Sequence, residues 1–203
     1  MRTLVIQAGG ESKRMGKDKA LVPFLGKTLI QRVLERLRPI ADEVLVTTNH
    51  PQSYRFLGVS LLTDVFPGRG ALGGLYTALQ AALHPYVAVV ACDMPFANPE
   101  LFEVMFSALL ECKADAVIPQ SAEGLEPFHA VYCRERCLPL VRQALADGHW
   151  RADSWFKDAN LRYFIPQEVA LFDPLGLTFK NVNTPDELLQ AEEIARKLEN
   201  PET

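Results

Sequence analysis

The sequence predicts an α/β protein, with one three-layer α/β/α domain over residues 1–203 and helices on both faces of a mainly parallel sheet. Two observations support this prediction. Short apolar runs alternate with amphipathic stretches of helical spacing along the chain, which is typical of βαβ units. The run at 86–91 contains no charged residue, as expected of a central parallel strand that helices cover on both faces.

Other apolar runs predict the remaining strands of the sheet. The first strand is expected at 3–7, where two glycines end it, and the second at 43–47. Two further strands are expected at 115–119 and 128–133. Ligands of open α/β sheets bind beyond the carboxyl ends of the strands. We therefore expect the functional site in the loops that follow the first, second and central strands.

Most of the expected helices have recognisable start signals. Thr28 with Gln31, and Thr184 with Glu187, fit capping boxes. Asn98 followed by a proline fits another helix start. The expected helices start at Thr28, cover 72–83 after Gly70, run from Pro99 to about Glu111, cover 136–146, and end the chain at about 185–199 before a frayed tail.

Composition and charge exclude several classes of protein. The formal net charge of −4 argues against a nucleic-acid-binding protein, which normally has a basic excess. The four cysteines form no C-x-x-C pair and have no nearby His partner, so a structural zinc site is not expected. No apolar run approaches the ~20 residues of a membrane span. We expect a cytoplasmic protein with reduced thiols and no membrane contact.

The loop after the first strand has the composition of a phosphate-binding loop. It combines three glycines with four cations in the run Gln7-Ala8-Gly9-Gly10-Glu11-Ser12-Lys13-Arg14-Met15-Gly16-Lys17-Asp18-Lys19. Glycines let backbone N–H groups approach phosphate oxygens, and the cations supply positive charge. The glycine spacing fits neither a Walker A loop nor a dinucleotide fingerprint. The alternative interpretation is a surface loop with solvated lysines.

Asp93 is a candidate metal ligand. It follows the central strand and precedes Pro95, so its carboxylate is expected in the crevice at the strand ends. A carboxylate there is suited to hold Mg²⁺ against triphosphate oxygens. The alternative is that Asp93 serves as a turn or cap residue, although Asn98 is better placed for the next cap.

Four segments, in this order, resemble the motifs of the molybdenum cofactor guanylyltransferases. They are Gly9-Gly10-Glu11-Ser12-Lys13-Arg14-Met15-Gly16-Lys17-Asp18-Lys19, Gly70-Ala71-Leu72-Gly73-Gly74-Leu75, Cys92-Asp93-Met94-Pro95-Phe96 and Asn181-Val182-Asn183-Thr184-Pro185. The chain departs from the family at three positions. Gln7 stands where Leu is usual, Ala71 where Pro is usual, and Glu126 where His is common.

The resemblance implies a Rossmann-like nucleotidyltransferase fold and the transfer of GMP from GTP to the phosphate of molybdenum-molybdopterin, with release of pyrophosphate. It implies Mg²⁺ as cofactor, held by Asp93, with Arg14 and Lys19 stabilising the charge on the phosphates. The implied nucleotide-binding residues are Gln7, Ala8, Gly9, Gly10, Arg14, Lys19, Asn49, Asp64 and Asp93. Asn181 and Asn183 are implied as supports of the metal or the second substrate. Asn49, Asp64 and the two C-terminal asparagines could equally be ordinary turn residues.

The implied partners are GTP, the molybdopterin cofactor and proteins that mature molybdoenzymes. Two other functions stay open at this point. One is the same chemistry on another substrate, either cytidylyl transfer or sugar-phosphate activation. The other is a catalytically silent GTP-binding adapter. Arg14, Lys19 and Asp93 argue against the adapter, because a protein that only binds nucleotide does not need all three.

Overall fold

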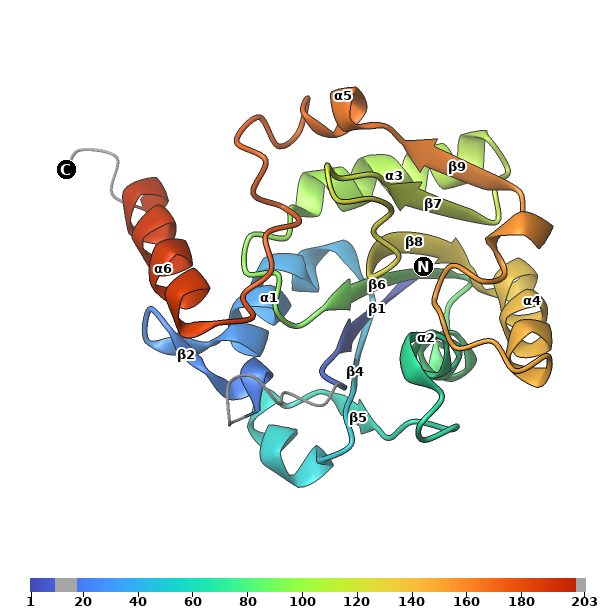
Figure 1. Cartoon of the computed structure of the whole chain (residues 1–203), viewed down its shortest axis with the longest axis horizontal. Coiled ribbons are helices and arrows are strands. Elements are labelled where there is room, and N and C mark those ends of the chain that lie inside the picture. Colours follow the sequence, from blue (N-terminus) through green and yellow to red (C-terminus); the bar gives the residue numbers. More distant parts are fainter. Residues whose placement is uncertain (10–17, 200–203) are drawn as a thin grey trace.

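The computed structural model describes residues 1–9 and 18–199 and contains a seven-stranded sheet with helices on both faces (Figure 1). The strand order across the sheet is β5-β4-β1-β6-β8-β7-β9. The strands are β1 Arg2–Gln7, β4 Glu43–Thr47, β5 Ser60–Leu62, β6 Tyr86–Ala91, β7 Ala116–Pro119, β8 His129–Cys133 and β9 Leu161–Phe164. A separate hairpin pairs β2 (Pro23–Phe24) with β3 (Lys27–Thr28).

The sheet is mainly parallel, as predicted, and β8 is its antiparallel strand. β1 pairs in parallel with both β4 and β6, and β8 runs antiparallel to β6 and β7. From β1 the chain first builds outward through β4 and β5, and then returns to place β6 on the other side of β1. The strand order therefore reverses between β1 and β6. Open α/β sheets bind their ligands in the crevice at such a switch point.

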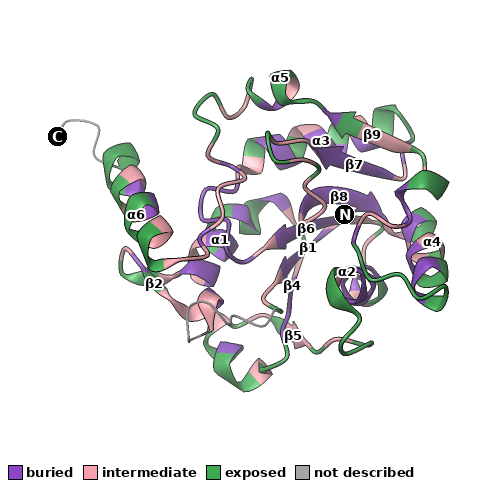
Figure 2. Cartoon of the chain, in the orientation of Figure 1, coloured by how far each residue is buried: buried purple, intermediate pink, exposed green. Residues whose placement is uncertain are grey.

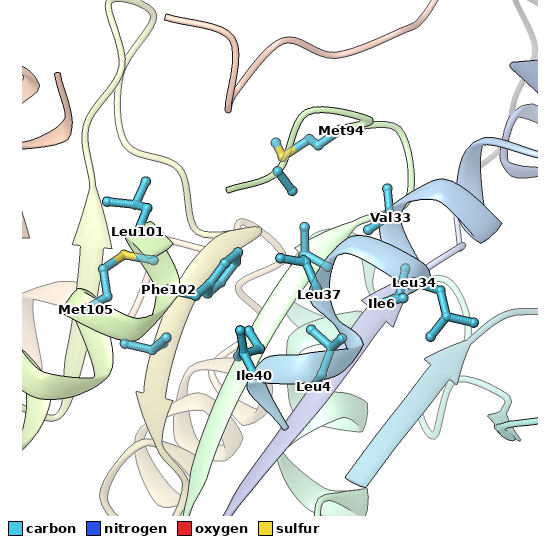
Figure 3. Close-up of a cluster of buried hydrophobic side chains, with 14 of the residues drawn as sticks. Leu4, Ile6, Val33, Leu34, Leu37, Ile40, Met94, Leu101, Phe102 and Met105 are labelled. Carbon is cyan, nitrogen blue, oxygen red and sulfur yellow. The ribbon is translucent and has the colours of Figure 1, made fainter. Parts of the chain in front are cut away.

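Two helices cover each face of the sheet. Alternate strand residues pack on opposite faces, so Leu4 and Ile6 of β1 belong to one buried cluster and Val5 to another. The first cluster joins the sheet to α1 (Leu29–Leu37) and α3 (Pro99–Glu111), as Figure 3 shows for part of it. The second joins the sheet to α2 (Gly70–Ala81) and α4 (Arg134–Ala146). In Figure 2 the central strands are buried between these layers.

A third, smaller cluster attaches the C-terminal helix to the hairpin. α6 (Pro185–Glu199) lies beside β2 in Figure 1, and its Ala191 and Ala195 pack with Phe24 and Val182. This contact brings the segment before α6 back to the strand ends. The remaining elements are short: η1 Lys19–Leu21, η2 Arg38–Ile40, η3 Pro51–Leu57, η4 Phe156–Asp158 and α5 Pro166–Val169.

Most predicted boundaries agree with the structure to within two residues. The capping boxes of α1 and α6 are formed: Thr28 Oγ1 accepts from the Gln31 amide, and Thr184 Oγ1 accepts from the Glu187 amide at 3.2 Å. The prediction placed the second helix at 72–83, whereas α2 ends at Ala81. The amides of Leu83 and His84 donate instead to Glu43 Oε2 at 2.9 Å and Thr3 Oγ1 at 3.3 Å, so the chain turns toward the sheet before the predicted end. Within the described residues, no helix is long and apolar enough to cross a membrane.

Candidate functional site

The carboxyl ends of β1, β4 and β6 are held together by backbone hydrogen bonds that continue past the strands. The amide of Ala8 donates to the carbonyl of Thr47 at 2.8 Å, and the amide of Cys92 donates to the carbonyl of Gln7 at 3.0 Å. These bonds place the first residues of the glycine-rich loop next to Asp93. Residues 7–9 and Asp93 therefore lie close together at the carboxyl ends of the strands, where the strand order reverses.

Lys19 joins two of the predicted site residues. Its ammonium forms an ion pair with Asp93 Oδ2 and donates a hydrogen bond of 2.8 Å to Asn183 Oδ1. The three residues come from the end of the glycine-rich loop, the end of β6 and the segment before α6. The side chains of Lys19 and Asp93 are only 21% and 11% exposed. A cation and two oxygen ligands are thus concentrated in a largely buried position at the strand ends.

The turn that presents Lys19 is fixed by Asp18. Asp18 caps the short helix η1, and its Oδ1 accepts from the Ala20 amide at 3.2 Å. Its other carboxylate oxygen accepts a hydrogen bond of 2.6 Å from the hydroxyl of Tyr54, which is fully buried in η3. Burial and the Asp18 carboxylate raise the pKa of this hydroxyl, so Tyr54 remains a donor. Lys19 is therefore anchored through its neighbour to the core.

Asp93 and Asn183 are anchored by the chain segment that precedes α6. The amide of Val182 donates to the Asp93 carbonyl at 3.0 Å, and Val182 itself is fully buried. The amide of Asn183 donates to Glu187 Oε2 at 2.6 Å, so the capping box of α6 also holds Asn183. This segment is more than a turn: it positions an amide oxygen within reach of Lys19.

Burial raises the pKa values of three acidic side chains at or near the strand ends. Burial, followed by the Asp93 charge, raises the pKa of the Cys92 thiol, so Cys92 stays protonated and inert as a nucleophile. Burial also raises the pKa of the Asp64 carboxyl, which lies just beyond β5. At Glu126, burial is again the main cause of a raised pKa, with Glu123 and Asp93 adding to it.

The structure brings together only some of the predicted residues. Lys19, Asp93 and Asn183 are in direct contact, whereas Asn49 lies exposed after β4. Asp64 and Asn181 are partly buried near the ends of their segments. Gly9 is exposed, and an added side chain there would meet no described atom within 4 Å. The predicted roles of Gly10 and Arg14 concern positions outside the described residues.

Two features were not predicted from the sequence. Tyr54 was missed because it lies in a 3₁₀ helix, whose short sequence has no helical or strand periodicity. The direct pairing of Lys19 with Asp93 was missed because 74 residues separate the two positions. His129, at the start of β8, packs in the core and has no part in the site. Its ring is fully buried, stacks on Phe102 and contacts Phe179 edge-on.

The arrangement is suited to binding an anion. A lysine ammonium at the end of a glycine-rich loop, beside the carboxyl ends of parallel strands, attracts phosphate oxygens. Asp93 and Asn183 fix the direction of the ammonium and supply carboxylate and amide oxygens of the kind that bind Mg²⁺. Within residues 1–9 and 18–199 no group of three or more His, Cys, Asp and Glu side chains could hold a metal ion alone.

Comparison with known proteins agrees with this interpretation. Residues 4–161 match the family described as the MobA-like NTP transferase domain. A protein named molybdenum cofactor guanylyltransferase from Desulfosudis oleivorans is 34% identical over 191 residues, which cover 94% of this chain and 94% of that protein.

Solved structures show the same fold. The crystal structure of molybdopterin-guanine dinucleotide biosynthesis protein A from Archaeoglobus fulgidus superposes with a TM-score of 0.83 at 28% identity and covers 96% of this chain and 99% of that one. The 4-diphosphocytidyl-2C-methyl-D-erythritol synthase from Anaerococcus prevotii superposes with a TM-score of 0.71, covering 96% and 98%, at only 13% identity. The second likeness is one of fold alone.

Proposed function

This chain belongs to the MobA-like NTP transferase family, and we propose that it transfers GMP from GTP to the phosphate of molybdenum-molybdopterin and releases pyrophosphate. The observation that carries this proposal is the contact of Lys19 with both Asp93 and Asn183 at the switch point. It unites three of the four sequence motifs in one place. Relatives named molybdenum cofactor guanylyltransferases, which align over nearly the whole chain, support guanylyl transfer rather than cytidylyl or sugar-phosphate chemistry.

In this reaction an oxygen of the acceptor phosphate attacks the α-phosphorus of GTP. A new P–O bond forms, the bond between the α-phosphorus and its bridging oxygen breaks, and the electron pair leaves with pyrophosphate. Catalysis of this kind rests on positioning and on neutralising charge. Lys19 supplies one fixed positive charge for the phosphates, and Asp93 with Asn183 keeps that charge in place. Arg14, in the glycine-rich loop, would grip two oxygens at once through its planar guanidinium.

The remaining predicted residues would hold the nucleotide. The backbone of Gln7, Ala8, Gly9 and Gly10 would surround it where β1 ends. Asn49 and Asp64 follow the neighbouring parallel strands β4 and β5, so they lie at the same carboxyl ends of the strands as Gln7. This placement supports a nucleotide that extends along the strand ends, with its phosphates beside Lys19.

The residues at the site fit a Mg²⁺ ion. Mg²⁺ in nucleotide sites is held by one or two protein oxygens together with substrate phosphates and water. Asp93 and Asn183 offer one carboxylate and one amide oxygen, and a carboxylate can bind an ammonium and a cation through its two oxygens. When bound, Mg²⁺ would neutralise triphosphate charge as a Lewis acid. GTP and the molybdopterin cofactor are the proposed partners, and proteins that mature molybdoenzymes would receive the product.

The test measures pyrophosphate release by the purified protein with GTP, Mg²⁺ and molybdenum-molybdopterin. Lys19→Met should reduce turnover by at least about a hundredfold, the equivalent of ~2.7 kcal/mol of transition-state stabilisation. Lys27→Met is the matched control, because the ammonium of Lys27 pairs with Glu35 on the exposed surface rather than with Asp93 or Asn183. Equal turnover of the two variants would contradict the proposed role of Lys19. GTP binding by the parent without pyrophosphate release would favour a silent adapter.

A further inference from the structure

Lys19 engages oxygen atoms that a magnesium ion at this place would use. Its ammonium forms an ion pair with Asp93 Oδ2 and donates a hydrogen bond of 2.8 Å to Asn183 Oδ1. Carboxylate and amide oxygens of this kind are also the protein ligands of Mg²⁺. Of the side-chain oxygens of Asp93 and Asn183, only Asp93 Oδ1 is therefore left without a contact to the ammonium.

The ammonium is held firmly between its two partners. The amide of Asn183 donates to Glu187 Oε2 at 2.6 Å, so the start of α6 keeps the Asn183 residue in place. The side chains of Lys19 and Asp93 are only 21% and 11% exposed, and water therefore weakens their attraction less than it would at the surface. A cation that approaches Asp93 meets Lys19 already bound there.

The neighbouring carboxylates are committed to other donors. Asp18 accepts from the Ala20 amide at 3.2 Å through one oxygen and from the Tyr54 hydroxyl at 2.6 Å through the other. Glu187 Oε2 accepts from two backbone amides at the start of α6. Across residues 1–9 and 18–199, no group of three or more His, Cys, Asp and Glu side chains could hold a metal ion. The described side chains thus offer a lone divalent cation one carboxylate oxygen beside a positive charge.

This combination disfavours a free divalent cation and favours one that arrives with a triphosphate. An ammonium and a divalent cation on the same carboxylate repel each other, and the repulsion grows as water is excluded. Mg²⁺ loses its water ligands reluctantly, and proteins usually hold it through one or two carboxylates together with substrate phosphates. A triphosphate meets both conditions, because its oxygens supply the missing ligands and its negative charge neutralises the ammonium.

We propose that Lys19 keeps divalent cations out of the site until a triphosphate is bound. The ligand of the site is then the complex of metal and triphosphate, and the free ion is excluded. The inference rests on the proposed use of Mg²⁺ at Asp93. It gives Lys19 a second role besides attracting phosphates, because it prevents a metal-loaded protein without nucleotide from accumulating. Lys19 remains on Asp93 and Asn183 throughout, and the ion uses the remaining Asp93 oxygen.

The test uses Mn²⁺ as the probe, because electron paramagnetic resonance distinguishes bound from free Mn²⁺. Without nucleotide, the parent should bind Mn²⁺ no more tightly than Asp93→Asn does. Lys19→Met keeps the length of the side chain and removes its charge, so it should bind Mn²⁺ at least about tenfold more tightly, the equivalent of ~1.4 kcal/mol. Lys19→Arg retains the charge and should exclude Mn²⁺ as the parent does. Lys27→Met removes a lysine that pairs with Glu35 on the surface, and this matched control should also behave like the parent.

A double variant shows where the additional ion binds. Lys19→Met combined with Asp93→Asn should lose the gain in Mn²⁺ affinity that Lys19→Met produces alone. A gain that persists in the double variant would place the ion elsewhere and overturn the inference. Equal Mn²⁺ affinities of the parent and a folded Lys19→Met would overturn it as well.

The parent provides a further test that does not depend on the folding of any variant. In equilibrium dialysis it should bind Mn²⁺ when GTP is present and fail to bind it when GTP is absent. Binding of Mn²⁺ without GTP, or no binding with GTP, would overturn the inference. Failure of the proposed function has a different result: transfer of CMP in place of GMP would contradict guanylyl transfer, while exclusion of Mn²⁺ from the protein without nucleotide would still support the inference.

Discussion

Replacing Asp93 with Asn removes one negative charge from the contact with Lys19 and leaves the shape of the side chain nearly unchanged. Exposed ion pairs contribute about 0–1 kcal/mol to stability, and breaking a fully buried pair costs about 3–5 kcal/mol. The side chains of Lys19 and Asp93 are 21% and 11% exposed, which is between these limits. Asn183 continues to accept a hydrogen bond from Lys19. We therefore expect Asp93→Asn to lower the unfolding free energy by about 2 kcal/mol, or the melting temperature by about 4–8 °C in a chain of this size.

The same substitution should reduce turnover far more than stability. Without the carboxylate, Lys19 loses its charged partner and the proposed Mg²⁺ ion would lose its charged protein ligand. Turnover at saturating GTP should therefore fall at least about a hundredfold, or ~2.7 kcal/mol. Asp115→Asn is the matched control. Asp115 pairs with Arg136 at 2.7 Å, and its side chain is 16% exposed. It lies just before β7, so it is at the opposite end of the strands from Asp93.

The assay combines thermal melting of both variants with pyrophosphate release. Asp115→Asn should lose comparable stability and keep the turnover of the parent per folded molecule. A double-mutant cycle of Asp93→Asn with Lys19→Met measures the coupling of the pair, and the double variant should lose little more turnover than either single variant. A folded Asp93→Asn protein with turnover within threefold of the parent would refute the role of this carboxylate.

Three further outcomes are expected. Burial lowers the pKa of His129 from 6.5 to about 3, so between these pH values the unfolded chain binds one proton more than the folded protein. The unfolding free energy should therefore fall as the pH drops from 6.5 toward 3. A His129→Phe variant whose unfolding free energy depends on pH as steeply as that of the parent would refute this. Arg14→Ala should abolish most turnover. Arg2→Ala is its control: it loses only an ion pair with Glu103 at the amino end of β1 and should retain turnover. Similar rates for the two variants would argue against phosphate binding by the glycine-rich loop. Tyr54→Phe removes the hydroxyl that holds Asp18, and should cost about 1–2 kcal/mol of stability and reduce turnover severalfold, as chemical denaturation and kinetics would test.

The fold was predictable because local signals and the global fold agree. The apolar run of β6 and the capping boxes at Thr28 and Thr184 each depend on neighbours within four residues, and the structure confirms them. β9 was not predicted, because its Leu-Arg-Tyr-Phe sequence is short, and only pairing with β7 makes it a strand. The short η3 has no periodic pattern to reveal it.

The site was only partly predictable, because contacts between distant segments leave no local pattern. The strand-end rule predicted that Gln7 and Asp93 lie near one another, and in the structure a backbone hydrogen bond joins the ends of their strands. Nothing in the sequence indicated that Lys19 would bind Asp93 and Asn183 together, since that contact depends on α6 packing against the hairpin. The burial of the Gln7 side-chain amide against Gly74 could not be predicted either, because the two residues are distant in the sequence.

The central claim, guanylyl transfer, is tested most directly by following labelled phosphorus from the triphosphate. The purified protein is given molybdenum-molybdopterin and Mg²⁺ with GTP labelled on the α-phosphorus, GTP labelled on the γ-phosphorus, or α-labelled CTP. If GMP is transferred, the α-label of GTP appears in the pterin product, the γ-label appears in pyrophosphate, and CTP label stays in the nucleotide. Transfer of the γ-label to the pterin, or efficient transfer from CTP, would contradict guanylyl transfer.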